Sequence, residues 1–368
     1  MISKGLLDLG FEQTETDQCV FKKENVIILI YVDDCIIFSR TKEGLDETIS
    51  SIKKNFDITE EGDIEEYLGI QIDHESGFMR MSQPNLINRI INAIPGMDKA
   101  NPKPIPMSPT LIMTKDINGK IRQEDWNYRS LIGMLNYLVN TTHPELAYSV
   151  HQCAIFYNDP KHSHEQAVKD IARYLINTRI NKEDGTKYHG IIFNFDSTKS
   201  VECYVDASFA GDWNQIWSEE PSSVFSRTGY VIYFGGCPII WHSKLQSEIS
   251  LSTTEAEYIA LSQSMRDTIP LMALIKELAE VLPIIIERAN VHCTVFEDNN
   301  SCIELVKCPR MRPRTKHIGL KYHHFRSKVK DKLISVHRVD TKMQHGDLLT
   351  KALAEPQFFH LRKLIIGW

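Results

Sequence analysis

The chain has 368 residues, of which 42% are hydrophobic and 24% charged, and its formal net charge is −6. Such a composition excludes a collagen-like, coiled-coil or wholly disordered chain, and the length is sufficient for two or three domains. No apolar run approaches the ~20 residues of a membrane-spanning helix, and the N-terminal residues lack the apolar stretch of a signal peptide. The eight cysteines are scattered without a C-x-x-C pair. We therefore expect an intracellular protein with reduced thiols and no membrane contact.

Residues 1–100 alternate short strands and helices. The β-rich runs 26–32 and 35–38 are separated only by Asp33 and Asp34, which predicts a tight hairpin with these two acids at its tip. Apolar spacing then predicts, in chain order, a helix over 43–56, a strand over 67–72, a turn over 74–77, a strand over 78–81 and a helix from Pro84.

A proline-rich stretch, residues 101–109, is a plausible domain boundary because proline interrupts both helix and strand. The following segment, residues 125–180, is largely helical by its apolar periodicity. Its expected helices are Tyr128–Asn140, Glu145–Tyr157 and His164–Leu175, the last with a capping signal at Ser163.

From about residue 200 three strands are followed by alternating helices and strands, which predicts an α/β domain with a mixed sheet. The expected strands are Val201–Val205, Gly229–Phe234, Pro238–His242, Val291–Phe296 and Leu333–Val339. The expected helices are Thr254–Met265, Ile269–Val281, Asn300–Lys307, Ile318–Lys330 and Gly346–Ala354.

Positive charge is concentrated in residues 307–338. This stretch holds eleven lysines or arginines and one acid, so it carries +10 while the rest of the chain carries −16. A basic block on an acidic protein indicates a surface for a polyanion, and a solvated helix face is an equally good interpretation. If the first interpretation holds, the residues expected to contact nucleic acid are Arg310, Arg312, Arg314, Lys316, Lys321 and Arg326.

Four acids stand at the ends of expected elements in the last domain. Asp206 follows a strand, Glu257 lies in the first turns of a helix, Asp298 ends a strand and Asp347 opens the last helix. If these ends meet at one edge of the sheet, four like charges share a small volume and require compensation. Carboxylate oxygens suit Mg²⁺, and two such ions stabilise the attacking water and the leaving oxygen of a phosphodiester displacement. For a single acid, an ordinary structural role such as a helix-terminal acid or part of a capping box is the better interpretation, so the metal site is predicted from the four acids together.

Taken together, the segments around these acids resemble the ribonuclease H domain of copia-type retrotransposon Pol polyproteins. The matching segments are Tyr204–Trp213, Ser226–Gly236, Trp241–Lys244, Ser252–Leu261, Glu297–Asn299, Arg314–Ile318 and Asp347–Leu353. The resemblance implies an α/β, ribonuclease H-like mixed sheet with flanking helices. It implies Asp206, Glu257, Asp298 and Asp347 as catalytic metal ligands, with Glu257 chosen over Glu255, and two Mg²⁺ ions as cofactors, Mn²⁺ being the alternative. For His337 two interpretations stay open, a proton-shuttling residue as in related ribonucleases H and a plain surface histidine.

The resemblance extends upstream. Tyr31–Asp34, followed by Glu66–Ile70, is similar to the palm hairpin of reverse transcriptases, which implies Asp33 and Asp34 as metal ligands. The matching helical segments are Tyr128–Leu138, Thr142–Tyr148 and His164–Leu175. The implied α+β and α/β architecture is a partial palm with a hairpin that holds the primer (1–100), a helical thumb or connection region (101–195) and a ribonuclease H-like domain (196–368).

Several features depart from the family. Polymerase chemistry needs a third palm carboxylate on an earlier strand, and neither Asp8 nor Asp17 lies in a suitable context, so we expect no DNA polymerisation by this chain alone. Residues 214–225 look like an insertion, and His143 and Glu145 replace a usual Arg and Asp.

The first functional hypothesis is therefore hydrolysis of the RNA strand of an RNA–DNA hybrid, in the cytoplasm (within a virus-like particle) or the nucleus. The basic stretch would hold the phosphate backbone, and the RNA 2′-hydroxyl would give specificity. The alternatives are a non-catalytic fragment that binds nucleic acid or pairs with another polymerase chain, and a decayed transposon relic.

Overall fold

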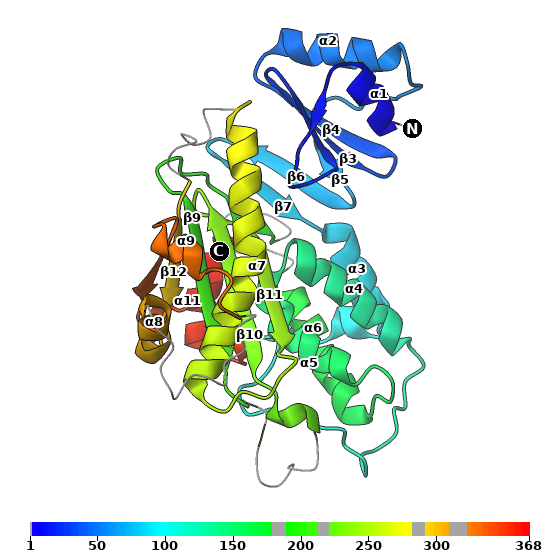
Figure 1. The fold of residues 1–368 in the computed structure, drawn as a ribbon. Helices are drawn as coiled ribbons and strands as arrows, with labels where there is room; N and C mark the ends of the chain where they lie inside the picture. The colour runs from blue at the N-terminus through cyan, green and yellow to red at the C-terminus, as the bar shows by residue number, and fades with distance from the viewer. Residues whose placement is uncertain (1, 179–188, 212, 214–220, 282–290, 309–321) are drawn as a thin grey trace.

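The computed structural model describes residues 2–178, 189–211, 213, 221–281, 291–308 and 322–368 (Figure 1). A four-stranded antiparallel sheet of order β1-β2-β3-β4, here called the N-terminal sheet, begins the chain and lies at the top of Figure 1. Its elements are α1 (Ile2–Asp8), β1 (Glu12–Gln13), β2 (Val20–Lys23), β3 (Val26–Tyr31), β4 (Asp34–Ser39) and α2 (Lys42–Lys53).

The hairpin between β3 and β4 is one residue out of the expected register. Tyr31 pairs with Asp34, so the two-residue turn consists of Val32 and Asp33, and Asp34 is the first residue of β4. Val32 has a φ of 54°, an unfavourable backbone conformation for a β-branched residue. The expectation that both acids form the turn is therefore wrong, because β3 ends one residue before the apolar run does and β4 begins one residue earlier, at Asp34.

A second sheet, the middle sheet, has the order β5-β6-β7-β8. Its first three strands follow one another in sequence, whereas β8 arrives only after the helical segment, and Ile191 of β8 pairs with Met81 of β7. Their bounds are β5 Glu66–Tyr67, β6 Ile70–Glu75, β7 Phe78–Ser82 and β8 Ile191–Phe193. The middle sheet thus joins the two ends of the helical segment.

The helical layer between β7 and β8 consists of α3 (Pro84–Asn92), α4 (Tyr128–Thr141), α5 (Ala147–Ile155) and α6 (His162–Asn177). Helix α5 starts later than expected, because Pro144–Leu146 forms a 3₁₀ turn before it. Helix α6 starts earlier than expected. His164 Nδ1 accepts a 2.8 Å hydrogen bond from the Lys161 backbone N–H, so this cap replaces the one expected at Ser163.

The C-terminal sheet has five strands in the order β11-β10-β9-β12-β13. Strands β9, β10 and β11 are antiparallel, and β12 runs parallel to both β9 and β13. Their bounds are β9 Val201–Ser208, β10 Arg227–Phe234, β11 Cys237–Leu245, β12 Cys293–Glu297 and β13 Ile334–Arg338. All five strands were expected from the sequence, and each keeps its position within a few residues.

The helices around this sheet differ more from expectation. One continuous helix, α7 (Thr253–Ala279), replaces the two that were expected, and Pro270 lies inside it. The last expected helix, Gly346–Ala354, is shorter in the structure and consists of the single turn α10 (Asp347–Thr350). A further helix, α11 (Glu355–Ile366), follows it. The remaining described helices are α8 (Asn300–Lys307) and α9 (Arg326–Lys330).

Separate hydrophobic cores cover the two faces of the C-terminal sheet. On one face α7 and α8 pack against residues such as Val205 and Val295, and Figure 1 shows α7 running along this face toward the N-terminal sheet. On the other face α10, α11 and the helical layer share a single core with Val231 and Tyr233 of β10. The sheet is therefore the central layer between two layers of helices.

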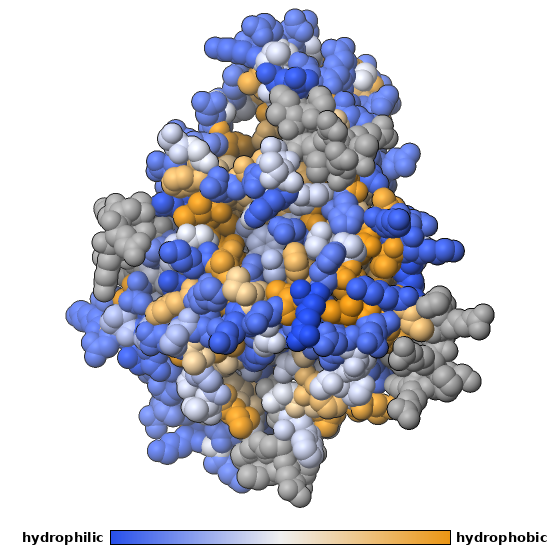
Figure 2. All heavy atoms as spheres, turned by 90° about the vertical axis from the view of Figure 1, so that its left-hand side faces the viewer, coloured by the Kyte–Doolittle hydropathy of each residue, from blue (hydrophilic) through white to orange (hydrophobic). Residues whose placement is uncertain are grey.

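The surface mixes polar and apolar residues. The face shown in Figure 2 has hydrophobic residues gathered across its middle, with hydrophilic residues around them and over the N-terminal sheet above. Within the described residues, no helix combines the length and apolarity needed to cross a membrane.

Candidate metal centre at the edge of the C-terminal sheet

Three carboxylates from separate elements meet at one edge of the C-terminal sheet. Asp206 comes from β9, Glu257 from the beginning of α7 and Asp298 from the residue after β12, and one ligand oxygen of each lies within 4.8 Å of the others. Strands β9 and β12 are parallel neighbours, so both deliver an acid at their carboxyl ends. These three residues are called the carboxylate cluster below. Asp206 and Glu257 are 5% and 6% exposed.

Asp347, the fourth expected ligand, lies beside the cluster on α10. Its carboxyl contacts that of Asp206, and the Thr350 hydroxyl of the same turn donates a hydrogen bond to Asp206 Oδ2. This close approach needs glycine, because a Cβ on Gly346 would lie 2.7 Å from Asp206 Cβ. The sequence 346–350 thus brings a second carboxyl and a hydroxyl against Asp206.

Burial and mutual repulsion raise the pKa of Asp206, Glu257 and Asp347. The pKa of Glu257 is raised well above its usual value, first by burial and then by Glu297, Asp206 and Asp298. Burial and then Asp206 raise the pKa of Asp347 to about 7. Burial is also the main cause of the raised pKa of Asp206. The group cannot be fully ionised at neutral pH without added positive charge.

The donor set fits a divalent cation with a preference for oxygen ligands. All four side chains offer carboxylate oxygens, the ligands typical of Mg²⁺ and Mn²⁺. Glu257 Oε2 is buried and has no hydrogen-bond partner among the described residues. An unpartnered buried carboxylate oxygen is costly in a protein and is explained by a ligand that the site is built to hold.

The structure argues against simpler roles for two of these acids. Ser252 is the N-cap of α7, its side chain accepting the Glu255 N–H, and Asn299 is the N-cap of α8, accepting the Cys302 N–H. The N-caps are therefore provided by neighbours of Glu257 and Asp298, and neither acid is itself the N-cap of its helix.

Sequence reasoning missed one more acid, Glu297. It is fully buried, its Oε1 accepts the Asn299 N–H at 2.9 Å, and its Oε2 has no partner in the described part of the chain. Burial raises its pKa well above the usual value. The two-residue alternation of β12, which buries Cys293 and Val295, could have indicated that Glu297 points into the core.

Asp33 and Asp34 are not part of this site. They are exposed at the tip of the β3–β4 hairpin, in a different sheet. Within the described residues, the only group of three or more side chains arranged to hold a metal ion is the carboxylate cluster.

The expected nucleic-acid contacts fall mainly outside the described residues. This applies to Arg310, Arg312, Arg314, Lys316 and Lys321, and to most of the suspected insertion at 214–225. Arg326 begins α9, and its guanidinium donates a hydrogen bond to the Cys308 carbonyl. His337 is exposed on β13, where its Nε2 lies 3.0 Å from Ser335 Oγ.

The fold and the site thus define a mixed α/β protein with a carboxylate centre at the edge of its largest sheet. Comparison with known proteins shows which proteins the chain is similar to. Residues 1–109 match the family "Reverse transcriptase (RNA-dependent DNA polymerase)". The chain is 32% identical over 365 residues to the Retrovirus-related Pol polyprotein from transposon TNT 1-94 of Nicotiana tabacum, and 31% identical over 357 residues to that from transposon RE1 of Arabidopsis thaliana. The chain is therefore related to copia-type retrotransposon Pol polyproteins, as its sequence motifs predicted.

These matches cover 96% of this chain, but only 26% and 23% of the respective polyproteins, so the chain spans about a quarter of their length. A solved structure of a foamy viral protease-reverse transcriptase in complex with double-stranded DNA overlaps 85% of this chain and 46% of that chain, with a TM-score of 0.42 and 15% identity.

Proposed function

We propose that the C-terminal part of this Pol-related chain is a metal-dependent ribonuclease H that hydrolyses the RNA strand of RNA–DNA hybrids. The observation that carries the proposal is the convergence of Asp206, Glu257 and Asp298 at one sheet edge, with Asp347 in contact. The resemblance of the surrounding segments to ribonuclease H domains names the substrate. The sheet supports it, because three antiparallel strands followed by two parallel ones, with a long helix on one face, suit a ribonuclease H-like fold.

The residues have separable tasks in this proposal. Asp206, Glu257, Asp298 and Asp347 hold the metal ions, Mg²⁺ or Mn²⁺. When bound, two such ions supply an activated water and positive charge at the leaving oxygen of the phosphodiester. Thr350 fixes one oxygen of Asp206 through its hydrogen bond. Removing such supporting contacts loosens ligand geometry and lowers metal affinity.

The substrate approaches the cluster as a polyanion. The basic stretch 307–338 supplies phosphate contacts, so hybrid binding weakens as salt rises. RNA is distinguished from DNA by its 2′-hydroxyl and by the shape of the hybrid.

The decisive experiment compares hybrid cleavage by the wild-type chain, Asp206→Asn and a matched control, Asp46→Asn, whose residue is exposed on α2. With Mg²⁺ and an end-labelled RNA strand, we expect Asp206→Asn to lose activity by roughly 100-fold or more, since even outer-shell partners of a metal cost up to that much. Asp46→Asn and wild type should cleave equally, and chelation by EDTA should stop both.

Equal cleavage by wild type and Asp206→Asn would overturn the proposal. If all variants bind the hybrid without cleaving it, and Mg²⁺ has no effect, a non-catalytic nucleic-acid-binding role is the better account.

A further inference from the structure

One cation is built into the carboxylate site. Lys351 follows the single turn of α10, four residues after Asp347, and its Nζ lies 2.6 Å from Asp347 Oδ1. Its backbone N–H also donates to the Asp347 carbonyl at 3.2 Å. The ion pair is therefore fixed to the same turn that brings Asp347 against Asp206.

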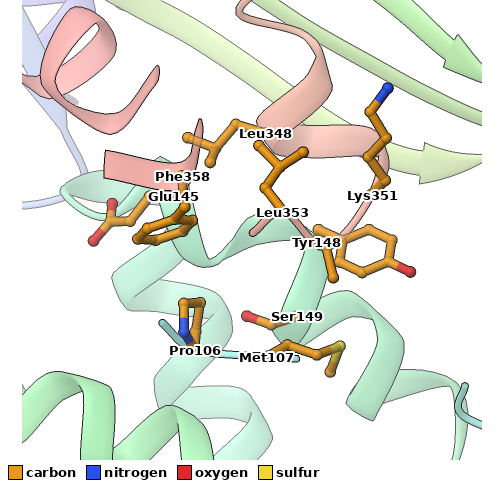
Figure 3. Close-up of a pocket in the computed structure, with 10 residues that line it drawn as sticks. Pro106, Met107, Glu145, Tyr148, Ser149, Leu348, Lys351, Leu353 and Phe358 are labelled. Atoms are coloured by element: carbon orange, nitrogen blue, oxygen red, sulfur yellow. The ribbon is translucent and has the colours of Figure 1, made fainter. Parts of the chain in front are cut away.

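The aliphatic part of the Lys351 side chain packs beside residues of α5 and of the C-terminal segment. It lines a small cavity together with Tyr148 of α5, Leu353 and Phe358. Figure 3 shows the ammonium pointing away from this cavity. The side chain is nonetheless 45% exposed, so the charged head has room to leave the carboxyl while the stem stays packed.

The positive charge of Lys351 acts unevenly on the site. It opposes the burial that raises the pKa of Asp206 and of Asp347. The charged neighbours that act on Glu257 are all acids: Glu297, Asp206 and Asp298. The Asp206–Asp347 side of the site thus has a cation in ion-pair contact, whereas the largest charge effects on Glu257 come from other acids.

We propose that Lys351 is an internal counter-cation that neutralises the Asp206–Asp347 side of the site and must be displaced by a divalent ion there. The two metal positions are then unequal. An ion bound by Asp206, Glu257 and Asp298 leaves the ion pair between Lys351 and Asp347 intact and binds first. An ion that needs Asp347 competes with the lysine and binds more weakly. This inference rests on the proposed metal centre and goes beyond it, because it assigns an order of occupancy and a positioning residue.

The test is calorimetric titration of the full chain with Mg²⁺ alone, without nucleic acid. Wild type should show a stronger and a weaker binding step. Lys351→Gln should tighten the weaker step by roughly three- to fivefold, the factor expected from removing a half-exposed ion pair. Lys351→Arg should keep the weaker step near its wild-type value. Lys363→Gln, an exposed substitution on α11, is the matched control and should change neither step.

Thermal unfolding with and without Mg²⁺ gives a second readout, because a loss of packing would lower the melting temperature equally in both conditions. In EDTA, Lys351→Gln should melt below wild type because the acids lose their counter-charge, and saturating Mg²⁺ should remove the difference. If Lys351→Gln does not fold, Lys351→Arg is measured in its place. Its retained charge should preserve the wild-type melting temperature in EDTA. A melting difference that persists unchanged in Mg²⁺, or binding steps that Lys351→Gln leaves unaltered, would overturn the inference while leaving the metal centre in place. Failure of the wild-type chain to bind any divalent ion would overturn both.

Discussion

His143 and Glu145 are enclosed where the helical layer meets α11, and both are fully buried. Burial, and then the charges of His189 and Arg362, lower the pKa of His143 to about 3. Burial raises the pKa of Glu145 to about 7, although Arg362 and the Tyr174 hydroxyl oppose the rise. Both side chains are therefore neutral in the folded protein over part of the pH range in which the unfolded chain carries their charges.

The signs of the two pH dependences are opposite. The unfolded chain releases the Glu145 proton from pH 4.5, whereas the folded protein keeps it until about 7, so stability falls as pH rises through this window and is level above it. For His143 the unfolded chain takes up a proton below pH 6.5 and the folded protein does not, so stability falls as pH drops toward 3.

Glu145→Gln should remove the first dependence and keep the second. Relative to wild type, the variant should gain stability between pH 4.5 and 7, up to about 3 kcal/mol, because each unit of pKa shift corresponds to about 1.4 kcal/mol. Urea unfolding at several pH values measures this difference. A difference between variant and wild type that is constant with pH would contradict the assignment.

Which site residues can be read from the sequence depends on their position within an element. Asp206 lies near the carboxyl end of β9 and Asp298 directly follows β12, so the shared edge was foreseeable. Glu297 was missed because a charged residue at the end of an apolar strand looks like a surface position. Lys351 was missed as well, although Asp347 and Lys351 are four residues apart and a helix over 346–354, as expected, would make them neighbours.

At the scale of elements, α7 shows where local signals were overruled. Proline removes one helical hydrogen bond, and two helices separated before Ile269 were predicted here. In the structure Met265, Met272 and Ile275 all pack into the same core, so continuing the helix buries apolar residues on both sides of the proline. By contrast, α11 went unpredicted, although Pro356 in its first turn is a usual helix-start signal. The strands were predicted better because their β-branched runs are short and bounded by turns.

Pro270→Ala should therefore stabilise the protein. Pro270 is exposed, so no packing is lost, and restoring a helical N–H should raise the free energy of unfolding by about 1–3 kcal/mol. Chemical denaturation measures the change. Pro356→Ala is the control, since a proline in the first turn has no helical bond to lose. Destabilisation by Pro270→Ala would mean that the proline shapes a bend on which the packing of α7 depends.

At the scale of the molecule, α7 connects the carboxylate cluster to the N-terminal sheet. Glu257 lies near its beginning, and Glu277 near its end accepts the backbone N–H groups of Glu15 at 2.8 Å and Thr16 at 3.1 Å. Lys22 of β2 forms an ion pair with Glu280, with 2.6 Å between Nζ and Oε2. The N-terminal sheet is thus held to the C-terminal part by one end of a helix.

Glu277→Ala should loosen this contact without reaching the metal centre. The two N–H groups lose their acceptor, so we expect faster hydrogen exchange in residues 14–22 and unchanged Mg²⁺ binding. Lys276→Ala, its sequence neighbour on α7, serves as the comparison. Unchanged exchange in residues 14–22 would show that the apolar contacts among Val20, Ile27 and Val281 hold the sheet without Glu277.

The core that joins β10, α10 and α11 to the helical layer limits where the chain can be divided into separately folding fragments. Leu348 and Leu349 pack into that core with residues of α4, α5 and α6. They lie between Asp347 and Thr350 in α10. A truncated chain that begins at residue 196 would lack the helical layer against which the turn carrying Asp347 packs. Whoever expresses the nuclease-like portion by itself should expect an aggregating product, and would do better to begin the piece before α3.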